Sequence, residues 1–318
     1  MNISFNDVIA MQQEIDDKIH TKNLLPNEYL FLPVEIPNAV TRKLGFQQNK
    51  TKEVYEVTDN AIRHFLQLSG TVMRFDYVRS MLMHDEIELL IQNLRGFDLP
   101  PIKLAQYRFY KNELIGILSD QYQNYTSLRF LSDVSQVLNN DQKWSIHDYN
   151  IDQWGTALSI YEKQSFHDQY HFGIFLRNSE VKLSSINMRF TVLTPKNQSI
   201  ILNYKKVDSK ATYLNQMHKG RFSTAENIQM MIEKFSEVQE LLKKRIEQGY
   251  ILVNVDEELK DFVQRVKLSK KRQAQVEKLF KENKISRNQF FDKLLEFAQD
   301  STFIKESVQE YVGDRLLL

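Results

Sequence analysis

The sequence contains no cysteine. Disulfide bonds, a thiolate nucleophile and a thiolate metal site are therefore excluded, because each of them requires a cysteine sulfur. A chain without cysteine also fits a reducing compartment, and we expect a cytoplasmic protein.

Long apolar runs and a large net charge are also missing. No window approaches the roughly 18 apolar residues of a membrane helix, and the first twenty residues do not have the pattern of a signal peptide. The 42 lysines and arginines nearly balance the 41 aspartates and glutamates. No overall field draws this protein to nucleic acid or to an anionic membrane, so any polyanion binding must use a local patch.

The common catalytic signatures are absent: no GxxxxGK[ST], GxGxxG, GxSxG, EF-hand loop or zinc-type Cys/His set occurs. The segment His167–His171 is similar to the HExxH zinc motif, but Asp168 replaces the glutamate and the predicted strand misaligns the imidazoles. We interpret both histidines as turn and surface residues. The sequence therefore predicts no metal, no cofactor and no enzymatic activity, and a hydrolase would have only Asp120 and Glu180 as candidate acids.

The clearest local pattern is Glu113–Leu138. A short β-branched apolar run ends at Ser119, and apolar residues then recur at helical spacing from Leu128 to Leu138. This pattern predicts a buried strand, a polar turn and an amphipathic helix. The chain before this segment is mostly helical in pattern, and the chain that follows it alternates with the period of strands.

These periods predict an α+β fold with a mainly antiparallel sheet, packed helices and a helical C-terminal region. We expect an N-terminal helix or arm over 1–28, an α+β core domain over 29–221 and the helical region over 222–318. Residues 29–57 fit either strands or an irregular linker. The predicted strands are 107–118 as a hairpin, 144–151, 157–162, 170–177, 187–193 and 199–204. The predicted helices are 5–20, 59–68, 75–83, 86–94, 126–139, 223–249, 256–267, 270–282, 286–298 and 304–312.

One predicted strand has an aromatic residue beside cations. His171, Phe175 and Arg177 alternate on one side of 170–177, and a binding surface for single-stranded nucleic acid needs stacking together with positive charge. The alternative is that Phe175 packs beneath a helix and the cations are ordinary surface residues. Residues that could extend this surface are Tyr122, Tyr125, Lys182, Arg189, Lys205 and Lys206.

A second basic patch begins the C-terminal helices and consists of Lys267, Lys270, Lys271 and Arg272. With the helix that starts at Arg287 it fits a helix-turn-helix or an ordinary αα-hairpin. The turn lacks glycine, and Asp292 and Glu296 would oppose phosphate contact, which favours the hairpin.

Three short segments resemble an uncharacterised family of phage and plasmid-like proteins that carries LSDRY and NSEVG motifs. The segments are LSDQY at 118–122, YEVTDNA at 55–61 and NSEV at 178–181. The resemblance covers about 50–205 and makes this chain a divergent member, because Gln121 replaces the arginine and Lys182 the glycine. It implies a mobile-element protein in bacterial cytoplasm and supplies no catalytic residues.

Two functional hypotheses follow. The first is a non-enzymatic DNA-metabolism protein of a phage or plasmid that binds or anneals single-stranded DNA and forms a homo-oligomer or binds a protein partner. The second is a virion structural or host-interaction protein that docks partners through its C-terminal helices. Neither hypothesis involves a membrane.

Overall fold

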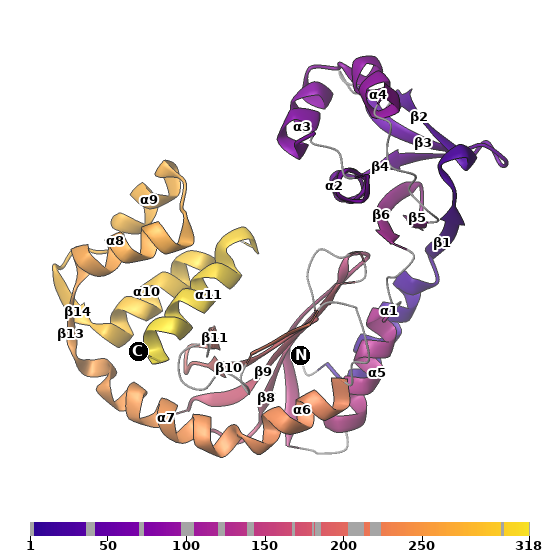
Figure 1. The fold of residues 1–318 in the computed structure, drawn as a ribbon. Helices are drawn as coiled ribbons and strands as arrows, with labels where there is room; N and C mark the ends of the chain where they lie inside the picture. Colours follow the sequence, from indigo (N-terminus) through magenta and orange to yellow (C-terminus); the bar gives the residue numbers. More distant parts are fainter. Residues whose placement is uncertain are drawn as a thin grey trace.

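The computed structural model confirms a mixed α+β fold with mainly antiparallel sheets and a helical C-terminal region. The structure describes residues 3–35, 42–69, 73–96, 105–119, 125–138, 143–166, 169–179, 181, 186–202, 213–216, 224–299 and 302–317. Figure 1 shows two large sheets that lie apart, with the C-terminal helices at the far end of the second sheet.

The first sheet has the strand order β1-β5-β6-β4-β3-β2. Its strands are β1 (Ile19–Leu24), β2 (Tyr29–Val34), β3 (Lys43–Gln48), β4 (Val54–Val57), β5 (Ala105–Tyr110) and β6 (Glu113–Ser119). Strands β4 and β6 run parallel, and every other neighbouring pair is antiparallel. The parallel pair requires a crossover connection, which the intervening helices provide.

Helices α2 (Asp59–Leu68), α3 (Phe75–Met83) and α4 (Ile87–Gly96) accompany this sheet. The Thr58 hydroxyl caps α2 by accepting a hydrogen bond from the Ala61 amide, as its sequence position predicts. Aromatic rings from three strands form the centre of the core, where Tyr29, Phe46 and Tyr107 lie within 5.3 Å of one another. The first sheet therefore has a hydrophobic core of its own.

The second sheet is antiparallel, with the order β11-β10-β9-β8-β7. Its strands are β7 (Trp144–Asp152), β8 (Gly155–Glu162), β9 (His171–Ser179), β10 (Ile186–Leu193), β11 (Ser199–Leu202) and β12 (Tyr213–Gln216), which also pairs with β10. One face carries Phe172, Ile174 and Leu176, all fully buried. This alternation along β9 is the one that the sequence predicts.

Helices cover that apolar face. They are α1 (Phe5–Asp16), α5 (Ser127–Leu138), α6 (Thr224–Glu233) and α7 (Phe235–Glu247). The Phe235 ring meets Phe172 and Phe190 edge-on, with centroids 4.7 and 5.4 Å apart. Helix α1 packs beside α5, although the chain continues from α1 directly into the first sheet (Figure 1).

The remaining C-terminal elements lie at the β11 end of the second sheet. They are the short helix η2 (Gln248–Tyr250), β13 (Leu252–Asn254), α8 (Val255–Val266), α9 (Lys270–Glu277), β14 (Lys284–Ser286), α10 (Arg287–Gln299) and α11 (Thr302–Leu317). Helix α11 packs on β11, on the sheet face opposite to the one that Phe172 occupies. The predicted capping box at Ser286 and Gln289 is present.

Two of the three segments that resemble the phage and plasmid-like family meet beside β6, and of the third, LSDQY, only Leu118 and Ser119 lie in the described residues. The Asn60 side-chain amide donates to the carbonyl oxygens of Ile115 at 2.9 Å and Val181 at 3.4 Å. A Cβ added at Gly116 would lie 3.2 Å from the Val181 side chain. Asn60 and Val181 therefore connect the first sheet to the segment that follows β9.

The predicted core region 29–221 contains both sheets except for β1, and each sheet has its own hydrophobic cluster. The predicted helix 5–20 ends at Asp16, and residues 19–24 pair with β5 as an edge strand. The predicted helix 223–249 is interrupted at Lys234 between α6 and α7. Its proposed capping residue, Ser223, lies outside the described residues.

The first sheet carries an acid-sensitive ion pair. The pKa of Glu53 is lowered to about 2 by hydrogen bonds from Lys22, Tyr55 and Thr51. Since the ordinary value is 4.5, Glu53 stabilises the fold above pH 4.5, and this contribution is lost as the pH falls towards 2. We expect the Glu53→Gln variant to be less stable than wild type at pH 7 and equally stable near pH 2. Urea unfolding midpoints at both pH values measure this difference, and a gap that persists at pH 2 contradicts the assignment.

Candidate functional site

The predicted aromatic and cationic surface on β9 lies beneath α11. Phe175 is 8% exposed, and Arg189 stacks on its ring with the guanidinium carbon 5.7 Å from the ring centroid. A base can stack on Phe175 only after α11 moves away. The geometry matches the alternative in which Phe175 packs beneath a helix.

The two cations of this surface pair with carboxylates of α11. Arg177 donates to Glu306 at 2.8 Å, and Arg189 bonds both Glu306, at 3.2 Å, and Glu310. The Arg189 side chain is 8% exposed and that of Arg177 is 40% exposed. Carboxylates thus occupy the positions that phosphate groups would need on Arg189, and Arg177 alone reaches the surface.

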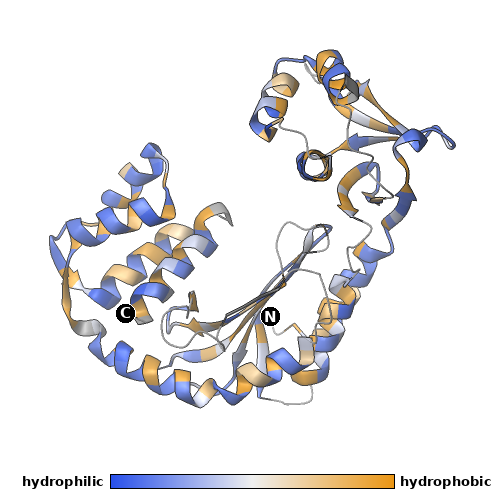
Figure 2. Ribbon diagram, in the orientation of Figure 1, coloured by the Kyte–Doolittle hydropathy of each residue, from blue (hydrophilic) through white to orange (hydrophobic). Residues whose placement is uncertain are grey.

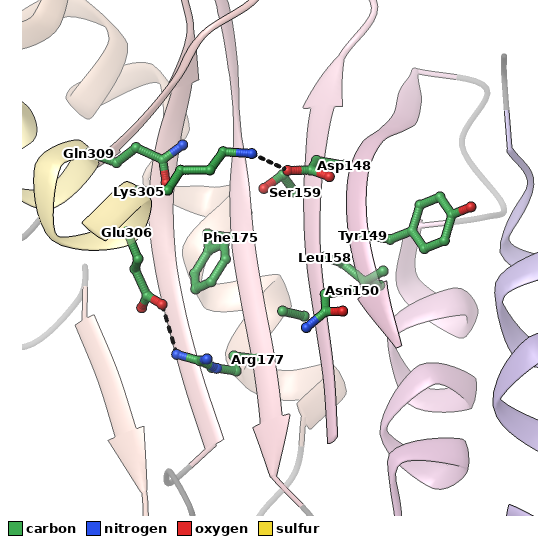
Figure 3. Close-up of a pocket in the computed structure, with 11 residues that line it drawn as sticks. Asp148, Tyr149, Asn150, Leu158, Ser159, Phe175, Arg177, Lys305, Glu306 and Gln309 are labelled. Carbon is green, nitrogen blue, oxygen red and sulfur yellow. Dashed lines mark hydrogen bonds and ion pairs between the residues drawn. The ribbon is translucent and has the colours of Figure 1, made fainter. Parts of the chain in front are cut away.

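Beside this contact the sheet and α11 enclose a groove (Figure 3). It has two neighbouring cavities of about 340 and 260 Å³, and both are lined by Asp148, Lys305 and Gln309. Lys305 pairs with Asp148 at 3.1 Å across the opening. The first cavity also includes Phe175 and Arg177, and the second also includes Gln198 and His147. We call these two cavities the amide groove.

The other predicted residues of this surface are dispersed. His171 lies at the opposite end of β9 from Arg177, and its Nδ1 is 2.9 Å from the Glu162 carbonyl oxygen. The Tyr125 hydroxyl donates to Asp133 at 2.5 Å near the start of α5. The residues of this prediction that lie outside the described part of the chain are Tyr122, Lys182, Lys205 and Lys206.

The second predicted patch is larger than its first four residues indicate. Between residues 267 and 287 the chain has eight cations and only two carboxylates, Glu277 and Glu282. We call this segment the basic lobe; its cations are Lys267, Lys270, Lys271, Arg272, Lys278, Lys281, Lys284 and Arg287. Within the described residues, none of its lysines forms an ion pair, and all six are exposed. Figure 2 shows α9 as mainly hydrophilic.

The basic lobe is fixed to the body of the C-terminal region. Ser269 caps α9 at its N-terminus, and Val276 is the one buried side chain of α9. After α9, the Phe280 ring packs on Phe290 at 5.0 Å, and Lys293 donates to the Leu279 carbonyl oxygen at 3.0 Å. The cations therefore project from a rigid support.

Neighbouring acids point away from the basic lobe. Asp292 and Glu296 of α10 both contact Lys196 in the β10–β11 turn, at 2.8 and 3.4 Å. On α8, Glu258 pairs with Arg315 of α11. The acidic character of α10, which argued against phosphate contact in the sequence, is thus directed at the second sheet.

Helix α9 ends at Glu277, five residues before the predicted end, and β14 separates it from α10. Only Lys267, Leu268 and Ser269 connect α9 to the preceding α8. Lys267 adopts the left-handed conformation, with φ 55°, at the end of α8. The basic residues therefore lie on α9 and on the segments that flank it.

The described residues offer neither a metal site nor a membrane span. No three histidine, aspartate or glutamate side chains gather in a way that could hold a metal ion. No described helix combines the length and the apolar composition needed to cross a membrane.

Comparisons with known proteins add no family assignment. The chain matches no protein-family model, no curated protein and no solved structure. The resemblance to the phage and plasmid-like family therefore stays a prediction.

Sequence reasoning missed most of the amide groove. Its walls come from β7, the β10–β11 turn, α10 and α11, which are distant in sequence, and its polar residues have no motif spacing. The exposed side of β7 was the one available signal, because Asp148, Asn150 and Asp152 alternate there with the period of a strand.

Proposed function

We propose that the protein is a non-enzymatic nucleic-acid-binding protein of a phage or plasmid that acts on single-stranded DNA in the bacterial cytoplasm. In this proposal the basic lobe supplies the phosphate contacts. The observation that carries it is the set of exposed lysines on and around α9 that lack acidic partners among the described residues.

Electrostatics supports this choice of surface over the β9 face. The exposed lysines of the basic lobe release counterions from a polyanion without first breaking ion pairs. Arg189, in contrast, would have to leave two carboxylates and a buried position. Because charges further apart than about 10 Å are screened at 0.1 M salt, the near-neutral net charge of the chain does not prevent local binding.

The test replaces two lysines of α9. We expect the Lys270→Gln/Lys271→Gln variant to bind a labelled single-stranded oligonucleotide about tenfold more weakly than wild type at 0.1 M salt. The slope of log K against log salt should become shallower by about 1.4, since each phosphate contact on a single strand contributes about 0.7. Fluorescence anisotropy over a salt series measures both quantities.

The matched control is Lys243→Gln/Lys244→Gln on α7. This pair is also adjacent, exposed and helical, and it has the same charge change. Affinity should be unchanged in this variant. Equal losses of affinity in the two variants would show that the change in net charge alone causes the effect. The absence of wild-type binding at micromolar protein would overturn the proposal.

A second candidate is the virion or host-interaction protein. It is favoured by the exposed apolar side chains of Ile251 and Leu252, which are 55% and 65% exposed beside β13 in the C-terminal region. Apolar exposure of this kind is typical of docking surfaces when it extends over a patch. A wild-type protein that binds no oligonucleotide in the titration above would favour this candidate.

A further inference from the structure

The amide groove contains a concentration of carboxamide side chains. They are Asn150, Asn197, Gln198, Gln299 and Gln309. None of these five side chains forms a hydrogen bond with another residue that the structure describes. Each carboxamide offers one acceptor and two donor hydrogens, so the groove has a large unused capacity for hydrogen bonds.

Two of the five carboxamides are nearly inaccessible to solvent. Gln198 is 5% exposed and Gln309 is 8% exposed. The Gln198 Oε1 atom is buried without any hydrogen-bond partner. Leaving a buried polar atom unpaired costs about 1–3 kcal/mol, and such groups are rare in folded proteins. Gln198 also lines the second cavity, and Gln309 lines both, so these two residues are the most enclosed carboxamides of the groove.

The charges of the groove cancel locally. Lys305 pairs with Asp148, and Arg177 pairs with Glu306, as Figure 3 shows. Burial lowers the pKa of His147, so that the imidazole is uncharged at neutral pH. A site with paired ions and neutral amides favours an uncharged polar ligand, and a polyanion would have to displace the carboxylates.

We propose that the amide groove binds a neutral nucleobase, presented either by a free nucleoside or by an unstacked residue of a single strand. Glutamine and asparagine side chains match the paired donors and acceptors on the edges of bases, and unstacked bases are read in this way. Phe175 contributes a little apolar surface to the first cavity, although α11 covers its ring against stacking. The first cavity, of about 340 Å³, reaches the size of small-molecule sites, which begin at about 300 Å³, and the second, of about 260 Å³, adjoins it.

The test is isothermal titration calorimetry of the full chain with adenosine, guanosine, cytidine and uridine, and with ribose alone. At least one nucleoside should bind, and ribose should not. The Gln198→Leu variant should bind that nucleoside at least tenfold more weakly while its melting temperature stays the same or rises, because leucine removes the unpaired buried oxygen. Gln309→Met serves as a second variant if Gln198→Leu does not fold.

The control is Gln275→Leu on the exposed side of α9, which should bind the nucleoside with wild-type affinity. Equal binding of ribose, unchanged affinity in both groove variants, or no nucleoside binding at millimolar concentration would each overturn the inference. The single-strand titration gives an independent answer. Nucleoside binding without oligonucleotide binding overturns the proposed function alone, whereas oligonucleotide binding without nucleoside binding overturns this inference alone.

Discussion

The Gly313→Ala variant is expected to detach α11 from the second sheet. A Cβ at Gly313 would lie 2.0 Å from the Ile201 carbonyl oxygen and 2.8 Å from its carbonyl carbon, and both are backbone atoms that cannot rotate away. Alanine favours a helix over glycine by about 1 kcal/mol. Overpacking of a close contact costs about 3 kcal/mol, so the clash exceeds the gain in helix propensity. Urea unfolding should show a net loss of about 2 kcal/mol.

The effect should extend to the amide groove, because α11 supplies Lys305, Glu306 and Gln309 to its wall. Nucleoside affinity should therefore fall together with stability. Gly249→Ala is the matched control: its Cβ would meet only the side-chain amide of Asn288, the flexible end of a surface side chain. A stability loss in the control as large as that of Gly313→Ala would show that alanine itself, and not the helix–strand contact, is responsible.

The sequence pattern predicts a helix or a strand wherever one side of that element is buried, because the buried side then carries apolar residues at a regular spacing. The strand and the helix of Glu113–Leu138 are both present, and the alternation along β9 places Phe172 and Leu176 in the core. The predicted helix 5–20 included the first two residues of the edge strand β1, and the other four were not predicted as a strand, because the residues of β1, IHTKNL, contain only one buried side chain. An exposed edge strand takes its conformation from the pairing with β5, which no local pattern reports.

Whether the β9 surface is accessible depends on α11, a helix that lies far away in the sequence. Alternation places Phe175, Arg177 and Arg189 on one face of the sheet, and the structure confirms that they share this face. The alternation along the strands does not predict that Glu306 and Glu310, more than a hundred residues later, cover the same face. The first part of the basic lobe was visible in the sequence because Lys270, Lys271 and Arg272 are consecutive, and local charge needs no tertiary contact to form a patch.

Removing the two carboxylates over Arg189 is expected to destabilise the protein strongly. Arg189 is buried, receives Glu306 and Glu310 as ion partners and donates from Nε to the Asn187 side chain at 2.5 Å. In the Glu306→Gln/Glu310→Gln variant the guanidinium stays charged and loses both ion pairs. Breaking a buried pair from one side costs about 3–5 kcal/mol, whereas an exposed pair is worth about 0–1 kcal/mol. Urea unfolding at neutral pH should show a loss of about 3–5 kcal/mol in the free energy of unfolding.

Adding Arg189→Met to that variant should restore much of the lost stability. Methionine fills similar space beside Phe175 without a charge, and replacing a whole buried ion cluster by apolar groups is often neutral. The triple variant thereby separates the cost of removing these two carboxylates from a buried charge from the cost of lost packing. If the triple variant is as unstable as the double variant, the carboxylates contribute by packing. If the double variant loses less than about 1 kcal/mol, water reaches Arg189 and the β9 face opens readily enough to accept a nucleic-acid strand.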